Sequence, residues 1–120
     1  MNEKEAMMRY MEQQAGEVQA RIEQLLAAVM ENETVINALP EIKKGAESFS
    51  ALGSGVFVKT KISDDSRVLL NLGADVLAEY SVKDTEERLK KIQENLKQDL
   101  EKLNAVMTKI KADYARIASQ

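Results

Sequence analysis

The residues that could do chemistry are few, and they fall in two short stretches. Gly53-Ser54-Gly55 has the composition of a phosphate-binding loop, but it precedes a predicted strand instead of linking a strand to a helix. Asp64 and Asp65 could hold a cation or act as an acid–base pair, yet the other ligands of an oxygen-rich loop and a nearby nucleophile are missing. We therefore predict no phosphate site, and we interpret the two aspartates as a solvated turn.

The other polar residues also predict no reactive centre. Lys43, Lys44, Lys59 and Lys61 form no dense basic face and have little aromatic interleaving, which disfavours nucleic-acid binding. The chain has no Cys and no His, so disulfides, thiolate nucleophiles, imidazole bases and the two commonest zinc ligands are excluded. We expect no catalytic residue, no metal, no cofactor and no enzymatic activity.

The composition favours long exposed helices. Three Tyr, two Phe and no Trp leave few large side chains for a globular core. Charged residues make up 31% of the chain, with 20 acidic and 17 basic side chains. This near balance argues against nucleic-acid binding and against disorder caused by charge repulsion. No apolar run approaches the roughly 20 residues that span a bilayer, and the N-terminus lacks the apolar stretch of a secretory signal. We expect a cytoplasmic protein that does not bind membranes.

A heptad pattern predicts a first long helix. Its apolar stripe is narrow, as in a coiled coil, and Asn32 is its one polar member, which we expect to fix the register of the helix pair. Pro40 ends or kinks this helix, and Gly45 closes any helical turn that follows. The predicted seam residues are Met8, Met11, Ala15, Val18, Ile22, Leu25, Val29, Asn32, Ile36 and Leu39.

A second helix is predicted from Ser81 onward. Ser81 and Asp84 fit a capping box, and an apolar stripe follows with spacings of three and four residues. We expect one interruption of the heptad, a stutter, because two successive spacings of four occur near Leu96. The predicted stripe is Thr85, Leu89, Ile92, Leu96, Leu100, Leu103, Met107, Ile110, Tyr114 and Ile117.

The two stripes can be paired antiparallel, as expected for helices of similar length joined by a compact insert. Val29 would then lie opposite Ile92, and Met11 would lie opposite Ile110. The result is an arm on the order of 50 Å long at about 1.5 Å per residue. The alternative remains that any two amphipathic helices offer some register.

The segment between the helices alternates as strands do. Gly53, Gly55 and Gly73 and the turn at Ser63–Ser66 separate four short apolar runs, which we predict to form two β-hairpins. Both faces carry apolar residues, and the segment is too small to bury them, so we interpret it as an assembly joint. The apolar residues assigned to this joint are Leu52, Val56, Phe57, Val58, Ile62, Val68, Leu69, Leu70, Leu72, Val76, Leu77 and Tyr80.

Methionines gather at the free end of the predicted arm. Methionine is adaptable and is favoured on surfaces that bind many partners, and Gly16 should make this end fray more easily. The alternative is that Met8, Met11, Ile110 and Tyr114 simply close the seam. The residues predicted to form a binding tip are Met7, Met8, Met11, Tyr114 and Ile117.

The stretch "LGSGVFVKTKISDDSRVLLNLGADVLAEYS" resembles the α class of prefoldin subunits, most closely the archaeal ones. The two hairpins distinguish this class from the single-hairpin β class. The fold class expected is α+β, a long antiparallel two-helix coiled coil with two inserted β-hairpins that form an oligomeric β-barrel platform. The resemblance implies a single domain over residues 1–120, with a first helix over 1–44, hairpins over 45–81 and a second helix over 82–120.

The resemblance also implies a function. The chain would be a subunit of an ATP-independent chaperone, a hexamer of two α and four β subunits that holds non-native proteins at the arm tips and delivers them to a group II chaperonin. The joint residues would build the platform, and the tip residues would contact clients. One departure is the short tail after Ile117. The alternative is a homo-oligomeric or filamentous scaffold that assembles through the same hairpins.

Overall fold

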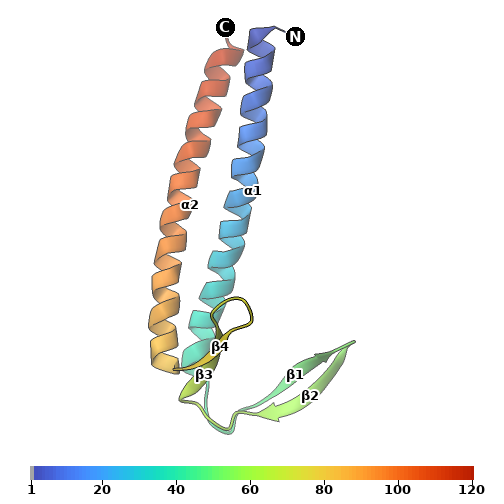
Figure 1. Ribbon diagram of the computed structural model, residues 1–120, viewed down its shortest axis with the longest axis vertical. Coiled ribbons are helices and arrows are strands. Elements are labelled where there is room, and N and C mark those ends of the chain that lie inside the picture. The colour runs from blue at the N-terminus through green and yellow to red at the C-terminus, as the bar shows by residue number, and fades with distance from the viewer. Residues whose placement is uncertain (1) are drawn as a thin grey trace. The chain divides into compact units, whose positions relative to one another are not determined.

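In the computed structural model, which describes residues 2–120, two β-hairpins lie along the chain between two long helices (Figure 1). Helix α1 covers Glu3–Ala38, the short 3-10 helix η1 covers Leu39–Glu41, and helix α2 covers Val82–Ala118. The chain forms two compact units. The helical unit consists of the residues up to Asn32 and those from Ile92 onward. The hairpin unit consists of Glu33–Lys91.

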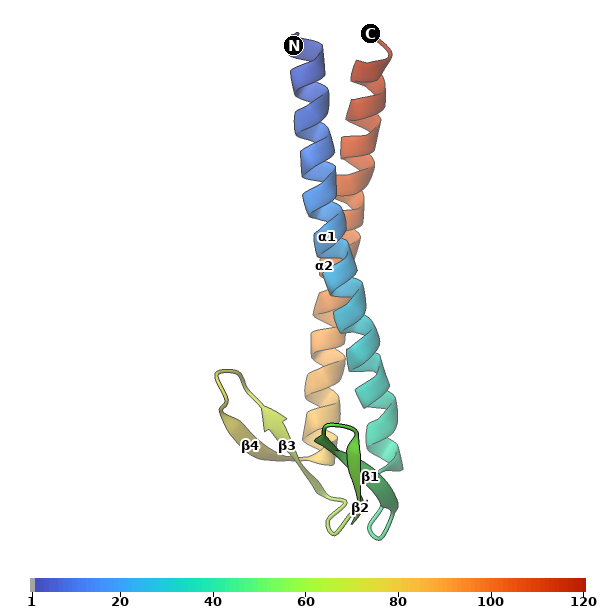
Figure 2. The same ribbon diagram turned by 90° about the vertical axis from the view of Figure 1, so that its right-hand side faces the viewer.

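In the helical unit, the N-terminal part of α1 and the C-terminal part of α2 lie side by side and run antiparallel (Figures 1 and 2). Ile22, Leu25, Val29 and Met107 are its buried apolar residues. All ten predicted seam residues of the first helix, including Ile36 and Leu39 of the hairpin unit, are buried or half-buried, so the heptad assignment is confirmed. Two long antiparallel helices with two hairpins between them were therefore predicted correctly.

The seam of α2 differs from the prediction at one position. Ile92 is 48% exposed, whereas its neighbour Gln93 is only 8% exposed and occupies the seam. With Gln93 in place, the buried and half-buried positions from Leu89 to Ile117, apart from the charged Asp113 beside Tyr114, alternate spacings of four and three, so the predicted stutter is wrong. The physical reason is that both ends of the buried amide have a partner: its NH₂ donates to the Val29 carbonyl and its oxygen accepts from Asn32, both at 3.0 Å.

The hairpin unit contains the four predicted strands. Strand β1 (Glu47–Gly53) pairs antiparallel with β2 (Val56–Lys61), and β3 (Arg67–Asn71) pairs antiparallel with β4 (Leu77–Ser81). Each hairpin is a separate two-stranded sheet in the described residues. The β1–β2 turn consists of Ser54 and Gly55, whose φ angles of 52° and 76° are the positive values that a tight hairpin turn requires.

Short backbone connections tie the hairpins to the chain around them. The Gly45 amide donates to the Ile62 carbonyl at 2.7 Å, and the Val82 amide donates to the Ser66 carbonyl at 2.9 Å. The Asp84 amide donates to the Ser81 hydroxyl at 3.0 Å, which confirms Ser81 as the N-cap of α2. The division into segments 1–44, 45–81 and 82–120 of one domain stays a prediction.

Candidate functional site

The two stretches that were considered as phosphate or cation sites are both turns. Gly53-Ser54-Gly55 closes the β1–β2 hairpin and opens no helix. The carboxylate of Asp64 accepts hydrogen bonds from the Ser66 hydroxyl at 2.6 Å and the Ser66 amide at 2.8 Å, and these hold the pKa of Asp64 below its usual value. Asp65 accepts from the Lys44 amide at 3.2 Å. The aspartates thus fix a loop, in agreement with the sequence-based interpretation.

The described residues show neither a metal site nor a membrane-spanning helix. Among residues 2–120, no group of three or more acidic, Cys or His side chains is arranged to hold a metal ion. No helix in the same part of the chain is both long and apolar enough to cross a membrane. Two apolar surfaces, one in each unit, are the candidate binding surfaces.

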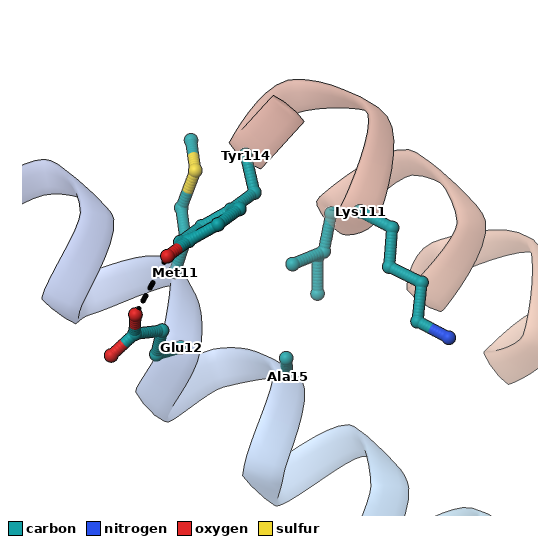
Figure 3. Close-up of a pocket in the computed structure, with 6 residues that line it drawn as sticks. Met11, Glu12, Ala15, Lys111 and Tyr114 are labelled. Carbon is teal, nitrogen blue, oxygen red and sulfur yellow. Dashed lines mark hydrogen bonds between the residues drawn. The ribbon is translucent and has the colours of Figure 1, made fainter. Parts of the chain in front are cut away.

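The first surface is a groove near the free end of the helical unit (Figure 3). It has a volume of about 210 Å³. Figure 3 shows the ring of Tyr114 and the side chain of Met11 close together, with the Lys111 ammonium directed away from them. The groove is lined by Met11, Glu12 and Ala15 of α1 and by Ile110, Lys111 and Tyr114 of α2. We call these six residues the tip groove.

One hydrogen bond joins the two walls of the tip groove. The Tyr114 hydroxyl donates to the Glu12 carboxylate at 2.8 Å. This bond raises the pKa of the Tyr114 phenol above its ordinary value, because the carboxylate stabilises the protonated hydroxyl. The bond holds the Tyr114 ring against α1 and leaves the floor of the groove apolar.

The predicted tip residues differ in exposure. Met7 is 48% exposed, whereas Met8, Met11, Tyr114 and Ile117 are half-buried. Ile110 is half-buried as well, so the burial also fits the alternative in which Met8, Met11, Ile110 and Tyr114 close the seam. The assignment of the five residues to client contact therefore stays a prediction.

Sequence reasoning missed Tyr10. Its ring is 58% exposed beside Met7, and its hydroxyl accepts a hydrogen bond from the Gln14 amide at 3.0 Å. The sequence did contain a signal for Tyr10, because it is an aromatic residue outside the heptad seam and lies between Met8 and Met11. Ala15 and Ile110 were likewise assigned to the seam alone, although both line the tip groove.

The second surface covers the hairpins. Eight of the twelve predicted joint residues are large apolar side chains exposed by 43% to 70%: Leu52, Val56, Phe57, Val58, Leu69, Leu72, Val76 and Leu77. The other four, Ile62, Val68, Leu70 and Tyr80, are half-buried. Phe49, which sequence reasoning left out of the joint, is 68% exposed. Apolar exposure on this scale marks an interaction surface.

The strand register assigns these residues to faces. In the β1–β2 hairpin, Phe49 and Phe57 share one face with an ion pair between Lys59 and Glu47 at 2.8 Å, and Val58 belongs to the other face. The β3–β4 hairpin is divided in the same way. Its half-buried face consists of Val68, Leu70, Ala78 and Tyr80, and its exposed face carries Leu69 and Leu77. Both hairpins therefore leave apolar side chains and strand edges in water.

Comparison with known proteins identifies relatives over most of the chain. The family model described as "Prefoldin: Prefoldin subunit" matches residues 11–120. Prefoldin subunit alpha of Thermoplasma volcanium is 33% identical over 88 residues, which cover 72% of this chain and 68% of that protein. Prefoldin subunit alpha of Nitrosopumilus maritimus is 32% identical over 92 residues, which again cover 72% of this chain but only 63% of the relative.

A solved structure has the same fold over the full chain. A subunit of the filamentous PFD from Methanocaldococcus jannaschii, determined by cryo-EM, superposes with a TM-score of 0.79 at 17% sequence identity. The superposition covers 100% of this chain and 99% of that one. At this identity the likeness concerns the fold alone.

Proposed function

We propose a function on the premise that the chain belongs to the prefoldin family, with α subunits as its relatives. Prefoldin subunits are chaperone components without enzymatic activity, so the expectation of a non-enzymatic coiled-coil chaperone is confirmed at the level of the family. An α subunit implies a complex with β subunits. The finer details of assembly, clients and delivery are part of the proposal.

The proposed activity is ATP-independent holding of non-native proteins. The chain assembles with a second α copy and four β-class subunits into a hexamer, captures clients at the arm tips in the cytoplasm and passes them to a group II chaperonin. The observation that carries this proposal is the exposed apolar surface of the hairpins, which include Phe49, Leu52 and Leu69, each at least 65% exposed.

Assembly follows from the cost of leaving that surface in water. Burial stabilises by about 25 cal/mol per Å² of apolar surface, and an isolated two-stranded hairpin is marginal in water. The free edges of both hairpins also offer unpaired backbone groups to a neighbouring strand. A β-barrel platform would bury both features together, so the joint residues are the proposed interface.

Client capture is assigned to the other apolar surface. The tip groove lies between α1 and α2. Met7 and Tyr10 are exposed on the same end of α1 and present a flexible thioether and an aromatic ring. A single contact of this kind is weak. Six arms on one platform would bind a client through several weak contacts at once, which raises the overall affinity without any new contact.

A client assay tests the holding activity. The chain mixed with a β-class subunit, without ATP, is added to a chemically unfolded protein, and aggregation is followed by light scattering. We expect suppression at a ratio near one hexamer per client. Aggregation as fast as in buffer would contradict the proposed activity.

A second candidate is a homo-oligomeric or filamentous scaffold built from this chain alone. It is favoured by the fold, which matches a subunit of a filamentous assembly over its whole length. In that case the same joint residues bind identical hairpins, and the helices act as spacers. Electron microscopy of the pure chain distinguishes the two candidates, because filaments form without a β-class subunit only in the second.

A further inference from the structure

The seam of the helical unit contains one pair of amide side chains. Asn32 on α1 donates to the Gln93 oxygen at 3.0 Å, and Gln93 donates to the Val29 carbonyl at the same distance. Gln93 is 8% exposed. The other described seam positions of this unit, Met8 to Val29 on α1 and Leu96 to Ile117 on α2, carry no amide. Two polar residues therefore meet in a seam that is otherwise formed by apolar side chains and the Tyr114 ring.

An apolar heptad seam defines its register poorly. If α2 slid along α1 by one heptad, leucine, isoleucine, valine and methionine would again face residues of the same kind. The amide pair is different. Leu25 and Leu39 stand one heptad on either side of Asn32, so either slip would place the buried Gln93 amide opposite a leucine. A buried amide without a partner is strongly disfavoured.

Gln93 also determines which face of α2 packs against α1. The exposed Ile92 next to it is the more apolar residue and would be expected inside on hydropathy alone. Gln93 is inside because Asn32 and Val29 satisfy both ends of its amide. The pair thus selects the rotation of α2 as well as its position along α1.

We propose that Asn32 and Gln93 are positioning residues that lock the register of the helix pair and thereby build the tip groove. The groove exists only in one register, because Tyr114 must reach Glu12, and Ile110 must stand beside Ala15. A slip by one heptad would move α2 along α1 by about 10 Å and separate these residues. The lock acts whether or not the groove binds clients, so it does not rest on the proposed function.

Spin-label distances in the full-length chain test the lock. The chain has no Cys, so Glu17→Cys and Lys109→Cys, both at exposed positions, give one label on each helix. Wild type should show a single narrow distance distribution. Asn32→Leu/Gln93→Leu should keep its helical circular dichroism but show a second population, displaced along the helix axis by about one heptad. Asn32→Leu alone should also populate that second state.

A transplanted pair is the matched control. Leu25 precedes Asn32 by one heptad and Leu100 follows Gln93 by one heptad, so the two belong to the same antiparallel layer. Adding Leu25→Asn and Leu100→Gln to the double-leucine variant should restore the single wild-type distance. A single wild-type distance in the double-leucine variant would overturn the proposal, because the chain between the helices would then set the register. A mixture that persists after the transplant would overturn it too.

Discussion

The Tyr114 hydroxyl lies 2.8 Å from the Glu12 carboxylate and ties α2 to α1 across the tip groove. The two residues come from opposite ends of the chain, and neither bond partner belongs to the buried core. The bond connects the aromatic wall of the groove to the wall that carries Met11 and Ala15. Its titration offers a direct test of the tip geometry.

The bond makes the tip sensitive to alkaline pH. The pKa of Tyr114 is raised above its ordinary value of 10.0, so the folded tip holds the phenol proton more tightly than the unfolded chain does. The stability that the Tyr114–Glu12 hydrogen bond contributes is therefore fully present below pH 10, and it is lost as the pH rises through the folded-state pKa of Tyr114. Difference absorbance of wild type minus Tyr114→Phe should show a phenol that titrates above its ordinary range.

Glu12→Gln is the control for the alkaline titration. It keeps a hydrogen-bond acceptor of the same shape but removes the charge, and the phenol pKa should fall back toward its ordinary value. An unchanged titration in Glu12→Gln would contradict the assignment of the shift to this carboxylate.

Replacing the exposed apolar side chains of the tip should abolish client holding. Met7→Glu/Tyr10→Glu puts two charges where apolar contact is proposed, and we expect aggregation suppression to fall at least tenfold while the native mass of the assembly is unchanged. Gln13→Glu, which adds a charge at an exposed polar position of the same helix, is the control. Full activity of the double variant would mean that clients bind elsewhere.

A single charge on the exposed face of β3 should prevent assembly. Leu69 is 65% exposed, so Leu69→Asp should fold normally but place an unpaired carboxylate in the proposed interface. Size-exclusion chromatography with a β-class subunit should then show no hexamer. Asn71→Asp adds the same charge on the same face of the same strand and keeps the acceptor for the Gly73 amide, which now lies 2.8 Å from the Asn71 oxygen.

The Asn71→Asp control decides between two explanations. If it blocks assembly as strongly as Leu69→Asp, then added charge is responsible, and Leu69 is not an apolar contact. Normal assembly of both variants would place the interface away from this face of β3.

Neighbouring leucines of α1 should differ widely in their effect on stability. Leu25 is 3% exposed, and Leu25→Ala should lower the free energy of unfolding by about 2 to 5 kcal/mol. Leu26 is 43% exposed, and Leu26→Ala should change it by no more than about 0.5 kcal/mol. Thermal or urea unfolding followed by circular dichroism measures both. Equal effects would contradict the seam described for α1.

Much of the fold was predictable because local patterns determine it. The heptad seam from Met8 to Leu39, the cap at Ser81 and the glycines at the β1–β2 turn act through spacing and backbone preference, which a sequence displays directly. Four strands in two hairpins followed from alternation. The resemblance of the hairpin stretch to prefoldin α subunits also predicted the family, and the comparisons show that the chain belongs to it.

The errors arose where a side chain's partner decides its position. Hydropathy places Ile92 inside and Gln93 outside, and only the contact with Asn32 and Val29 reverses that order. Tyr10 lies off the seam, so periodicity gave no reason to single it out. The bond between Glu12 and Tyr114 depends on the register of α2 along α1, which an apolar seam leaves open in the sequence.

The native mass of the purified chain, alone and mixed with a β-class prefoldin subunit, tests the central claim most directly. We predict that the chain alone forms no defined large assembly, and that the mixture gives one species with the mass of two copies of this chain and four of its partner. A stable monomer that remains unchanged in the mixture would contradict the account, because the exposed apolar hairpins would then have no neighbour to cover them.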